Sequence, residues 1–585
     1  MVLHASQDFR VALEQFSKAI PDLVSIIKAP DSNFQKRRRA NILLQFYIDM
    51  LLEIYSQKKE VAYGIDAVNE IFKLTDVRYS RVGSALSESS ARAASLINPE
   101  LADLVRQEQD AGKKIKSLEA VFHNAAAASS DAQSDALVSL RRDIQSLTEA
   151  RNAILERIEN EFPKYTNFIH PRPPEIEQIQ EQLLPEEAFI AIWTLEEKTC
   201  IWAISQGKPP AFAVIDLGED AVRKKVARLR RALQPNVRLL SNIPRFDLKT
   251  AYEIYTRMLQ PVASGWEDAR SLLVAINGPL DQIPLAVLPT KKVKRVLDQT
   301  LLFEEYRSIP WLIRRVAITR LPSAASLLTL RALPPPDPAR ESFAGFGDPI
   351  FSLDQLRKAP ATQSLLSQPG VSSGDIAIRG VRIIENGEEL GQTNLSSIRI
   401  GQLCRLPDTA DEIQQIAKSL KADPVKDVFL GKAATETNVK SQDLSLKKIV
   451  AFATHALLSG DLDGLTQPAL AFSAPEVTEL DEDGLLTLGE ILSLVLNADM
   501  VVLSACNTGV GDGSGNEAIS GLGRAFFYAG ARALLVTLWP VETTSANKLT
   551  TELFRHQQED KSLSRAWALQ KSIIKLIEDS GMKDH

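Results

Sequence analysis

Two residues that can do chemistry together, His455 and Cys506, each end a short apolar run in the C-terminal half of the chain. The runs, residues 449–454 and 500–505, are rich in Val, Ala, Ile, Leu and Phe, which is typical of strands buried on both faces of a parallel sheet. Reactive groups in such sheets lie at the carboxyl ends of the strands, so we expect both side chains at one edge. The separation, 506 minus 455 or 51 positions, leaves room for a crossover helix.

A cysteine beside a histidine is the arrangement of a thiol nucleophile. An isolated thiol has a pKa of about 8.5, and a neighbouring imidazole can take its proton and later protonate a leaving amine. Residues 507–515 contain four glycines, and such a loop lets backbone N–H groups approach an oxyanion. In the alternative interpretation, Cys506 is a small core side chain and His455 is structural. The glycine-rich loop and the two strand ends favour catalysis.

The same residues resemble a known family. Residues 453–456 and 502–509 are similar to the histidine and cysteine motifs of CHAT domains, which are caspase-like cysteine peptidases related to separase, metacaspases and caspases. The resemblance covers about residues 180–575 and includes residues 277–280, 283–285, 321–326, 346–349, 522–532 and 538–541. It implies an α/β caspase-like fold with a central, mostly parallel sheet flanked by helices. The domain would span 175–585, with a pseudo-protease half at about 175–340 and an active half at about 341–585.

The resemblance also implies roles for individual residues. Cys506 would be the nucleophile and His455 the base and acid, with the backbone N–H groups of Cys506 and Ala456 as oxyanion donors. Many relatives have Gly where this chain has Ala456, and alanine fits unless φ is positive there. Ser504 stands where metacaspases carry an acid that helps to bind a basic P1 side chain. A basic P1 preference is therefore less secure in this chain.

The substrate pocket is expected in the loop that follows residue 538. Trp539 resembles the tryptophan of the corresponding separase loop, and the nearest acids are Glu542, Asp461 and Asp463. An acid buried beside a tryptophan would pair with arginine or lysine. In the plainer interpretation, Glu542 begins the next helix and Trp539 packs in the core. The sequence leaves a basic and an apolar P1 residue equally open.

Motifs for cofactors and metals are missing from the sequence. It contains no P-loop, no Cys-x-x-Cys pair and no clustered metal ligands, so we expect no cofactor and no metal site. Asp461, Asp463 and the acids of residues 481–483 are best explained as solvated turn charges. The calcium requirement of some metacaspases stays open for this chain.

Composition limits the class of protein. The 585 residues exceed one ordinary domain, and the net charge of −6 gives no hint of nucleic-acid binding. Three cysteines, Cys200, Cys404 and Cys506, make no disulfide framework and suit a reducing compartment. Cys200 lies in a predicted strand without a nearby histidine, so it is assigned to packing. Without a signal pattern or an apolar run of about 18 residues, we expect a soluble cytoplasmic protein that does not contact a membrane.

The N-terminal part is expected to be helical and without chemistry. Residues 1–98 pair helices in a manner similar to tetratricopeptide repeats, with a buried helix at 41–55 and its partner at 62–74, but no 34-residue signature repeats. Residues 99–170 form a coiled-coil-like hairpin that turns at 124–131. Its seam on the second helix is interrupted by Arg151 and consists of Leu137, Leu140, Ile144, Leu147, Ile154 and Ile158. A rigid spacer or docking surface is the expected role.

The region from 175 alternates strands and helices. Strands at 189–195, 200–204 and 211–215 are close in sequence and predict an antiparallel meander at a sheet edge. Later strands at 272–276, 316–318, 343–346 and 428–430 alternate with helices, which predicts right-handed crossovers and a largely parallel sheet. Residues 351–404 form an irregular, turn-rich connection with a short β-like run at 376–384. Such a long loop could cover the active site or dock a substrate.

Three functions remain open from the sequence. The first is a cysteine endopeptidase that cuts a specific protein substrate and is recruited or held inactive through its N-terminal helices. The family implies bacterial defence or programmed cell death, with a pore-forming protein as one kind of substrate and a protein activator on the helices. The second is a catalytically silent caspase-like interaction scaffold. The third is another thiol enzyme, such as an amidase or a transferase.

Overall fold

A computed structural model describes residues 9–28, 34–77, 99–128, 135–162, 173–234, 243–293, 304–335, 337–358, 378–379, 383–385, 388–390, 399–504, 521–539 and 541–579. The chain divides into two compact units. One comprises residues 1–182 and 323–335, and the other comprises residues 183–322 and 336–585. The predicted domain boundaries at 98, 170 and 175 stay predictions.

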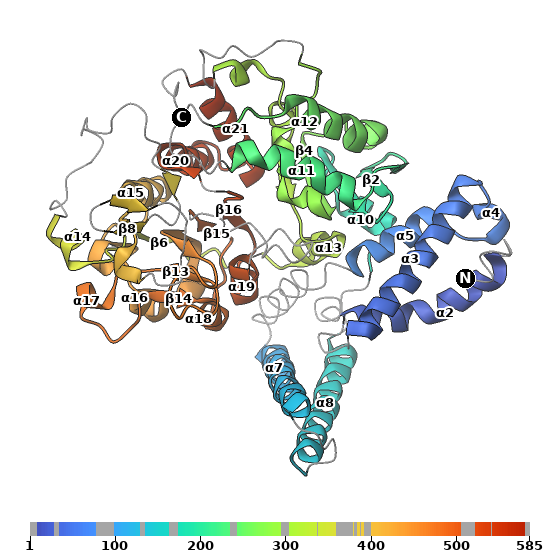
Figure 1. The fold of residues 1–585 in the computed structure, drawn as a ribbon, viewed down its shortest axis with the longest axis horizontal. Helices are drawn as coiled ribbons and strands as arrows, with labels where there is room; N and C mark the ends of the chain where they lie inside the picture. The colour runs from blue at the N-terminus through green and yellow to red at the C-terminus, as the bar shows by residue number, and fades with distance from the viewer. Residues whose placement is uncertain are drawn as a thin grey trace. The chain divides into compact units, whose positions relative to one another are not determined.

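The described part of the first unit is helical (Figure 1). Its helices are α2 (Phe9–Lys28), α3 (Phe34–Ser56), α4 (Glu60–Tyr63), α5 (Ala67–Leu74), α7 (Pro99–Ala128), α8 (Asp135–Glu161), α10 (Ile176–Gln182) and α13 (Ala324–Ala332). Helix α3 is buried along one side, as predicted for residues 41–55. The single partner helix predicted at 62–74 is wrong, because Gly64 ends α4 at a φ of 63° and Asp66 starts α5 by accepting from the Asn69 N–H.

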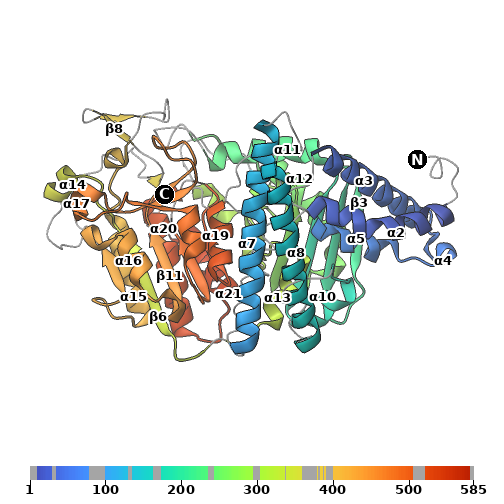
Figure 2. The same ribbon diagram turned by 90° about the horizontal axis from the view of Figure 1, so that it is seen from below.

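Helices α7 and α8 form the predicted hairpin and lie side by side along their length (Figure 2). The seam residues of α8 are all at least partly buried. Arg151 does not break the seam, because its guanidinium pairs with the buried Glu108 of α7 at 2.6 Å. Arg151 packs over Gly112, where a Cβ would lie at an ordinary contact distance of 3.5 Å from the Arg151 Nε. The turn predicted from residue 124 begins too early, because α7 continues to Ala128 through alanines, the strongest helix formers.

A capping contact ties residues 323–335 to the rest of the first unit. The Asp76 carboxylate accepts hydrogen bonds from the backbone N–H groups of Ala324, at 3.1 Å, and Ala325, at 2.8 Å. These are N–H groups of the first turn of α13, which have no partner within the helix itself. A negative charge there also suits the helix dipole.

The second unit contains two five-stranded sheets. The first has the order β3-β2-β1-β4-β5, and its strands are β1 (Glu187–Thr194), β2 (Thr199–Ser205), β3 (Ala211–Ile215), β4 (Ser271–Asn277) and β5 (Ala317–Arg320). Strands β1, β2 and β3 form the predicted antiparallel meander, while β4 is parallel to β1 and β5. Cys200 lies buried in β2.

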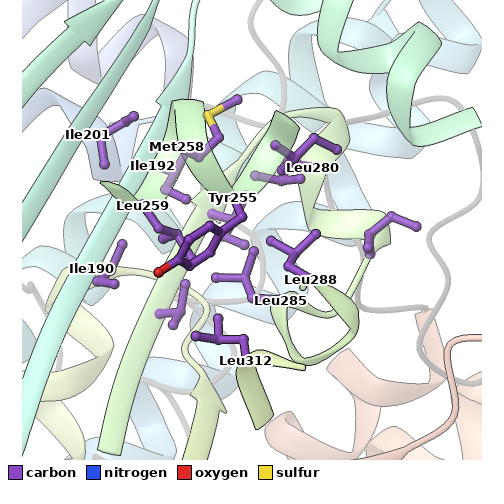
Figure 3. Close-up of a cluster of buried hydrophobic side chains, with 14 of the residues drawn as sticks. Ile190, Ile192, Ile201, Tyr255, Met258, Leu259, Leu280, Leu285, Leu288 and Leu312 are labelled. Atoms are coloured by element: carbon purple, nitrogen blue, oxygen red, sulfur yellow. The ribbon is translucent and has the colours of Figure 1, made fainter. Parts of the chain in front are cut away.

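One face of the first sheet is covered by an aliphatic core (Figure 3). Side chains of β1 and β2 point toward Tyr255, Met258 and Leu259, which follow α12 (Leu248–Ile254), and α11 (Glu219–Leu233) adds a row of valine and leucine. The core is completed by the short turns that carry Leu280, Leu285, Leu288 and Leu312. This half of the unit is therefore held together by branched aliphatic packing.

The second sheet is all-parallel and has the order β10-β6-β11-β15-β16. Its strands are β6 (Glu341–Gly347), β10 (Val428–Leu430), β11 (Lys447–Ala453), β15 (Met500–Leu503) and β16 (Leu534–Val536). Because neighbouring strands are parallel, the chain crosses over between them, as the alternation of strands and helices predicted. This sheet with its flanking helices confirms the predicted α/β class with a central parallel sheet, preceded by a helical N-terminal region.

Both faces of the second sheet are buried, which explains the unbroken apolar runs. Val450 and Phe452 of β11 pack toward one core with α16 (Glu436–Ser441), α18 (Leu488–Ser493) and α19 (Gly521–Ala529). Ile449 and Ala451 pack toward the other with α15 (Asp408–Leu420), α20 (Thr543–Glu559) and α21 (Arg565–Glu578). Alternate residues of one strand therefore serve two cores.

Smaller elements surround the carboxyl end of this sheet. Strands β12 (Ala456–Leu457), β13 (Ala469–Ala471) and β14 (Leu485–Thr487) form an antiparallel sheet, β7 (Ile378–Arg379) pairs with β17 (Val541–Glu542), and β8 (Ile383–Glu385) pairs with β9 (Glu388–Leu390). The remaining α-helices of the described ranges are α14 (Leu353–Lys358) and α17 (Pro475–Thr478). Within the described ranges, no helix is both long and apolar enough to cross a membrane.

Candidate active site

His455 lies two residues after the end of β11, at the carboxyl end of the all-parallel sheet, as the sequence predicts. Its side chain is buried, with a fractional exposure of 2%. Ala471 of β13 bonds to His455 and to the residue before it: the Ala471 N–H donates to the His455 carbonyl at 3.0 Å, and the Thr454 hydroxyl donates to the Ala471 carbonyl at 2.5 Å. The histidine therefore lies in a two-residue connection between β11 and β12 that is bonded to β13.

The imidazole of His455 has a defined orientation. Its Nε2 lies 2.7 Å from the backbone carbonyl oxygen of Cys404. A carbonyl can only accept, so Nε2 carries the hydrogen, and in the neutral ring the lone pair is then on Nδ1. The ring of Phe351 packs beside it, with the two ring centroids 5.6 Å apart. This arrangement leaves Nδ1 as the nitrogen that can act as a base.

Cys404 is the residue that sequence analysis missed. The group that matters is its carbonyl, and every residue carries one, so no residue type or spacing could have revealed it. Cys404 ends the irregular 351–404 region, and Phe351 begins it. Both ends of that region therefore lie against His455. Of its interior, residues 359–377 and most of 380–398 lie outside the described residues.

Cys506 also lies outside the described residues, but the strand before it is described. Strand β15 is the neighbour of β11 and runs parallel to it, with Phe452 opposite Leu503. The Ser504 N–H continues the pairing by donating to the Phe452 carbonyl at 2.9 Å. In the sequence, Cys506 follows Leu503 by three residues, as His455 follows Phe452 by three.

Ala456, the predicted oxyanion donor beside His455, begins β12 opposite Leu470. The neighbouring pair, His455 and Ala471, is bonded through the Ala471 N–H, and bonded and non-bonded pairs alternate along an antiparallel ladder. The Ala456 N–H therefore points away from β13. Among the described non-glycine residues, positive φ occurs at Lys58, Asp348, Lys421 and Glu479, so alanine is unstrained at position 456.

The predicted pocket residues lie in three segments, which follow β12, β15 and β16. Ser504 is buried directly after β15, and Trp539 is half-buried after β16. Glu542 lies in β17, opposite Ile378, and directly precedes α20. Both interpretations of Glu542 stay predictions.

Asp461 and Asp463 lie in the turn that follows β12. The Asp461 carboxylate accepts from the Leu458 N–H at 2.7 Å, which gives it a structural part in the turn. Burial raises the pKa of Asp461, and the Leu458 hydrogen bond opposes that change. Asp463 is exposed. Of the two, Asp463 has the side chain that could meet a ligand.

The acids of residues 481–483 support the local backbone. Glu482 accepts from the N–H and the hydroxyl of Thr437, both at 2.8 Å, and Asp483 accepts from the Leu485 N–H at 2.9 Å. In the part of the chain that the structure describes, no group of three or more His, Cys, Asp or Glu side chains is arranged to hold a metal ion.

The C-terminal part of the chain matches a known protein family. The CHAT domain family matches residues 248–585, which is more than half of the chain and includes the whole all-parallel sheet. No curated protein matches the sequence.

Proposed function

The chain belongs to the CHAT domain family, a caspase-like domain, and from this premise we propose that it is a cysteine endopeptidase with Cys506 as nucleophile and His455 as base and acid. One observation carries the proposal: a buried histidine at the carboxyl end of a parallel strand, with its Nε2 hydrogen on the Cys404 carbonyl. This bond places the ring hydrogen on Nε2 and so leaves Nδ1 as the nitrogen that would take the thiol proton.

The proposed reaction uses Nδ1 of His455. The thiol proton of Cys506 passes to Nδ1, and the sulfur attacks the carbonyl carbon of the scissile peptide. The N–H groups of Cys506 and Ala456 donate to the oxyanion. The amine leaves with the proton from His455, which breaks the C–N bond and leaves a thioester. Water, activated by His455, hydrolyses the thioester and returns the thiol.

We propose Trp539 as one wall of the P1 pocket. It follows β16, the edge strand next to β15, and it resembles the tryptophan of the corresponding separase loop. Glu542 and Asp463 are the acids that would select a basic P1 residue, and without them an apolar residue would suit the tryptophan. Because Asp461 is engaged by the Leu458 N–H, it is the weaker of the predicted acids.

The substrate we propose is a protein with a defined cleavage site, and a pore-forming protein is one candidate. The helices of the first unit would recruit it or bind an activating protein. Support comes from their helical composition, with a hairpin whose register is fixed by the Arg151–Glu108 ion pair. The cytoplasmic setting suggested by the three cysteines stays a prediction.

Cleavage of an unbiased peptide library, read by mass spectrometry, tests the proposal. The wild type is compared with Cys506→Ala and with His455→Gln, whose amide can keep the bond to the Cys404 carbonyl but cannot take up a proton. We expect cuts with the wild type alone. Full cleavage by Cys506→Ala would overturn the proposal. No cleavage by any of the three proteins would favour a catalytically silent scaffold.

The residue before each cut identifies the pocket. Lysine or arginine would point to Glu542 or Asp463, and the matching Glu542→Gln and Asp463→Asn variants should then lose that preference. An apolar residue would point to Trp539 alone. Either result refines the pocket without changing the roles of Cys506 and His455.

A further inference from the structure

The two ends of the 349–404 connection lie close together, because Asp348 and Arg405, which flank it, are bonded to each other. It leaves after β6 and returns just before α15, and the last residue of the return is Cys404. The carbonyl of Cys404 is the acceptor for His455 Nε2, at 2.7 Å. An interaction that holds the two ends of the connection together therefore also holds the carbonyl that accepts from His455.

A bidentate ion pair joins the residues that flank the connection. The Arg405 guanidinium donates from Nε to one oxygen of Asp348, at 2.7 Å, and from Nη2 to the other, at 2.6 Å. The Asp348 side chain is only 7% exposed and that of Arg405 20%. A bidentate pair of this kind restrains orientation as well as distance.

The Asp348 end of the pair is anchored to the fold. Its backbone has a φ of 52°, a left-handed conformation that aspartate and asparagine tolerate better than most residues. Its N–H donates to the Thr409 hydroxyl at 2.8 Å, and that hydroxyl donates to the Leu406 carbonyl at 2.6 Å. Asp348 is thereby tied to β6 on one side and to the start of α15 on the other.

The Arg405 end bears directly on the acceptor. The carbonyl of Cys404 belongs to the planar peptide unit that joins Cys404 to Arg405. The preceding carbonyl, of Leu403, is held by the Gln355 side chain at 2.7 Å. Cys404 is thus fixed from both sides, by Gln355 before it and by Arg405 after it.

We propose that Asp348 and Arg405 are positioning residues for His455, because their ion pair holds the Cys404 carbonyl at Nε2. The inference rests on the proposed function, since it concerns the histidine of that reaction. The carbonyl stabilises the protonated imidazole, and so the thiolate of Cys506 that pairs with it. Loss of the ion pair should leave Cys506 closer to an ordinary thiol.

The charges around Asp348 determine which substitutions are informative. Burial raises the pKa of Asp348, as do Asp408 and Asp411, whereas Arg405 lowers it. Removing Arg405 would leave a buried carboxylate among acids, so Arg405→Gln combines two effects. Asp348→Asn is the cleaner change, because asparagine keeps the shape and the left-handed backbone. Arg405→Lys keeps the charge but loses the planar guanidinium that makes two parallel hydrogen bonds to Asp348.

The experiment measures the rate of Cys506 alkylation by iodoacetamide across pH, with each cysteine read separately by peptide mass spectrometry. We expect the wild-type Cys506 to react well below pH 8.5, where an ordinary thiol titrates. Asp348→Asn and Arg405→Gln should react about 10- to 100-fold more slowly at pH 6. The pH at which alkylation reaches half its maximal rate should be higher in these two variants than in the wild type. For Arg405→Lys this pH should lie between the wild-type value and theirs. In the peptide assay the loss should fall on kcat rather than on KM.

Asp499→Asn is the matched control. It breaks another partly buried arginine–aspartate pair of the same sheet, Arg340–Asp499 at 2.7 Å, which lies at the amino end of β15. It should lower the unfolding temperature without moving the pH profile of Cys506. An equal shift in Asp499→Asn, or a wild-type profile in Asp348→Asn and Arg405→Gln, would overturn the inference and leave the proposed function standing. A wild-type Cys506 that titrates as an ordinary thiol would overturn both.

Discussion

The two ends of the all-parallel sheet hold their buried ionisable groups in opposite ways. At the amino end, Lys447 of β11 is 2% exposed and lies between two carboxylates, those of Glu341 and Asp427, the latter at 2.7 Å. At the carboxyl end of the same strand, His455 is equally buried, and its Nε2 bonds to a neutral carbonyl. Eight positions of the chain thus separate a lysine held by two carboxylates from a histidine held by a neutral carbonyl.

The difference shows how one sheet can serve both stability and chemistry. A buried ammonium shared by two carboxylates holds together the segments that carry them, because removing one partner leaves the others unpaired. A buried imidazole that faces a carbonyl can be neutral or charged, and small changes around it shift the balance. The amino end is therefore suited to holding strands together, and the carboxyl end to proton transfer.

The largest effect should come from His455. Replacing it by Gln should lower kcat/KM for peptide cleavage by about 1000-fold or more, because the base and acid of the reaction is lost. The unfolding temperature should change little, since glutamine can still donate to the Cys404 carbonyl. Steady-state kinetics together with thermal unfolding measures both. Activity within tenfold of the wild type would show that the carboxyl end does not differ chemically from the amino end.

Lys447 should give the opposite result. Lys447→Met leaves Asp427 and Glu341 without their shared cation, which should lower the free energy of unfolding by about 3 kcal/mol. The kcat of the folded fraction should stay near the wild-type value, because no group at the carboxyl end is changed. Urea unfolding and active-site titration of Cys506 measure the two quantities. A large loss of kcat with unchanged stability would contradict this division.

The sequence predicted the strand that carries His455 because its apolar run is unbroken and ends at a polar residue. It could not predict which group faces the imidazole, since the Cys404 carbonyl has no side-chain signature. The Asp348–Arg405 pair was also out of reach, because its members are 57 positions apart and meet only after the 349–404 connection has closed. The same holds for Arg151, whose partner Glu108 lies on the other helix of the hairpin. Local pattern predicts elements, and long-range pairing decides how buried charges are satisfied.

A smaller effect is expected from Glu341 at the amino end. Hydrogen bonds from Lys426 and Lys447 lower the pKa of Glu341 from its ordinary value of 4.5 to about 2. The folded state therefore favours the carboxylate, and this contribution to stability is present above pH 4.5 and lost as the pH falls toward 2. Because the side chain is partly exposed, Glu341→Gln should cost about 1 kcal/mol at pH 6. Unfolding in urea at pH 6 and pH 3 should show the gap between wild type and variant narrowing at pH 3, and a gap that widens would contradict the assignment.

The smallest effect should come from Cys404, although it supplies the group that His455 contacts. Cys404→Ala keeps the backbone carbonyl and removes the thiol, so kcat/KM should stay within about twofold of the wild type. Cys506→Ala, the same change at the proposed nucleophile, should abolish cleavage, which makes the two variants a matched pair. A loss with Cys404→Ala as large as that with Asp348→Asn would mean that the thiol itself takes part. The neutral partner of the histidine would then be a side chain rather than the backbone.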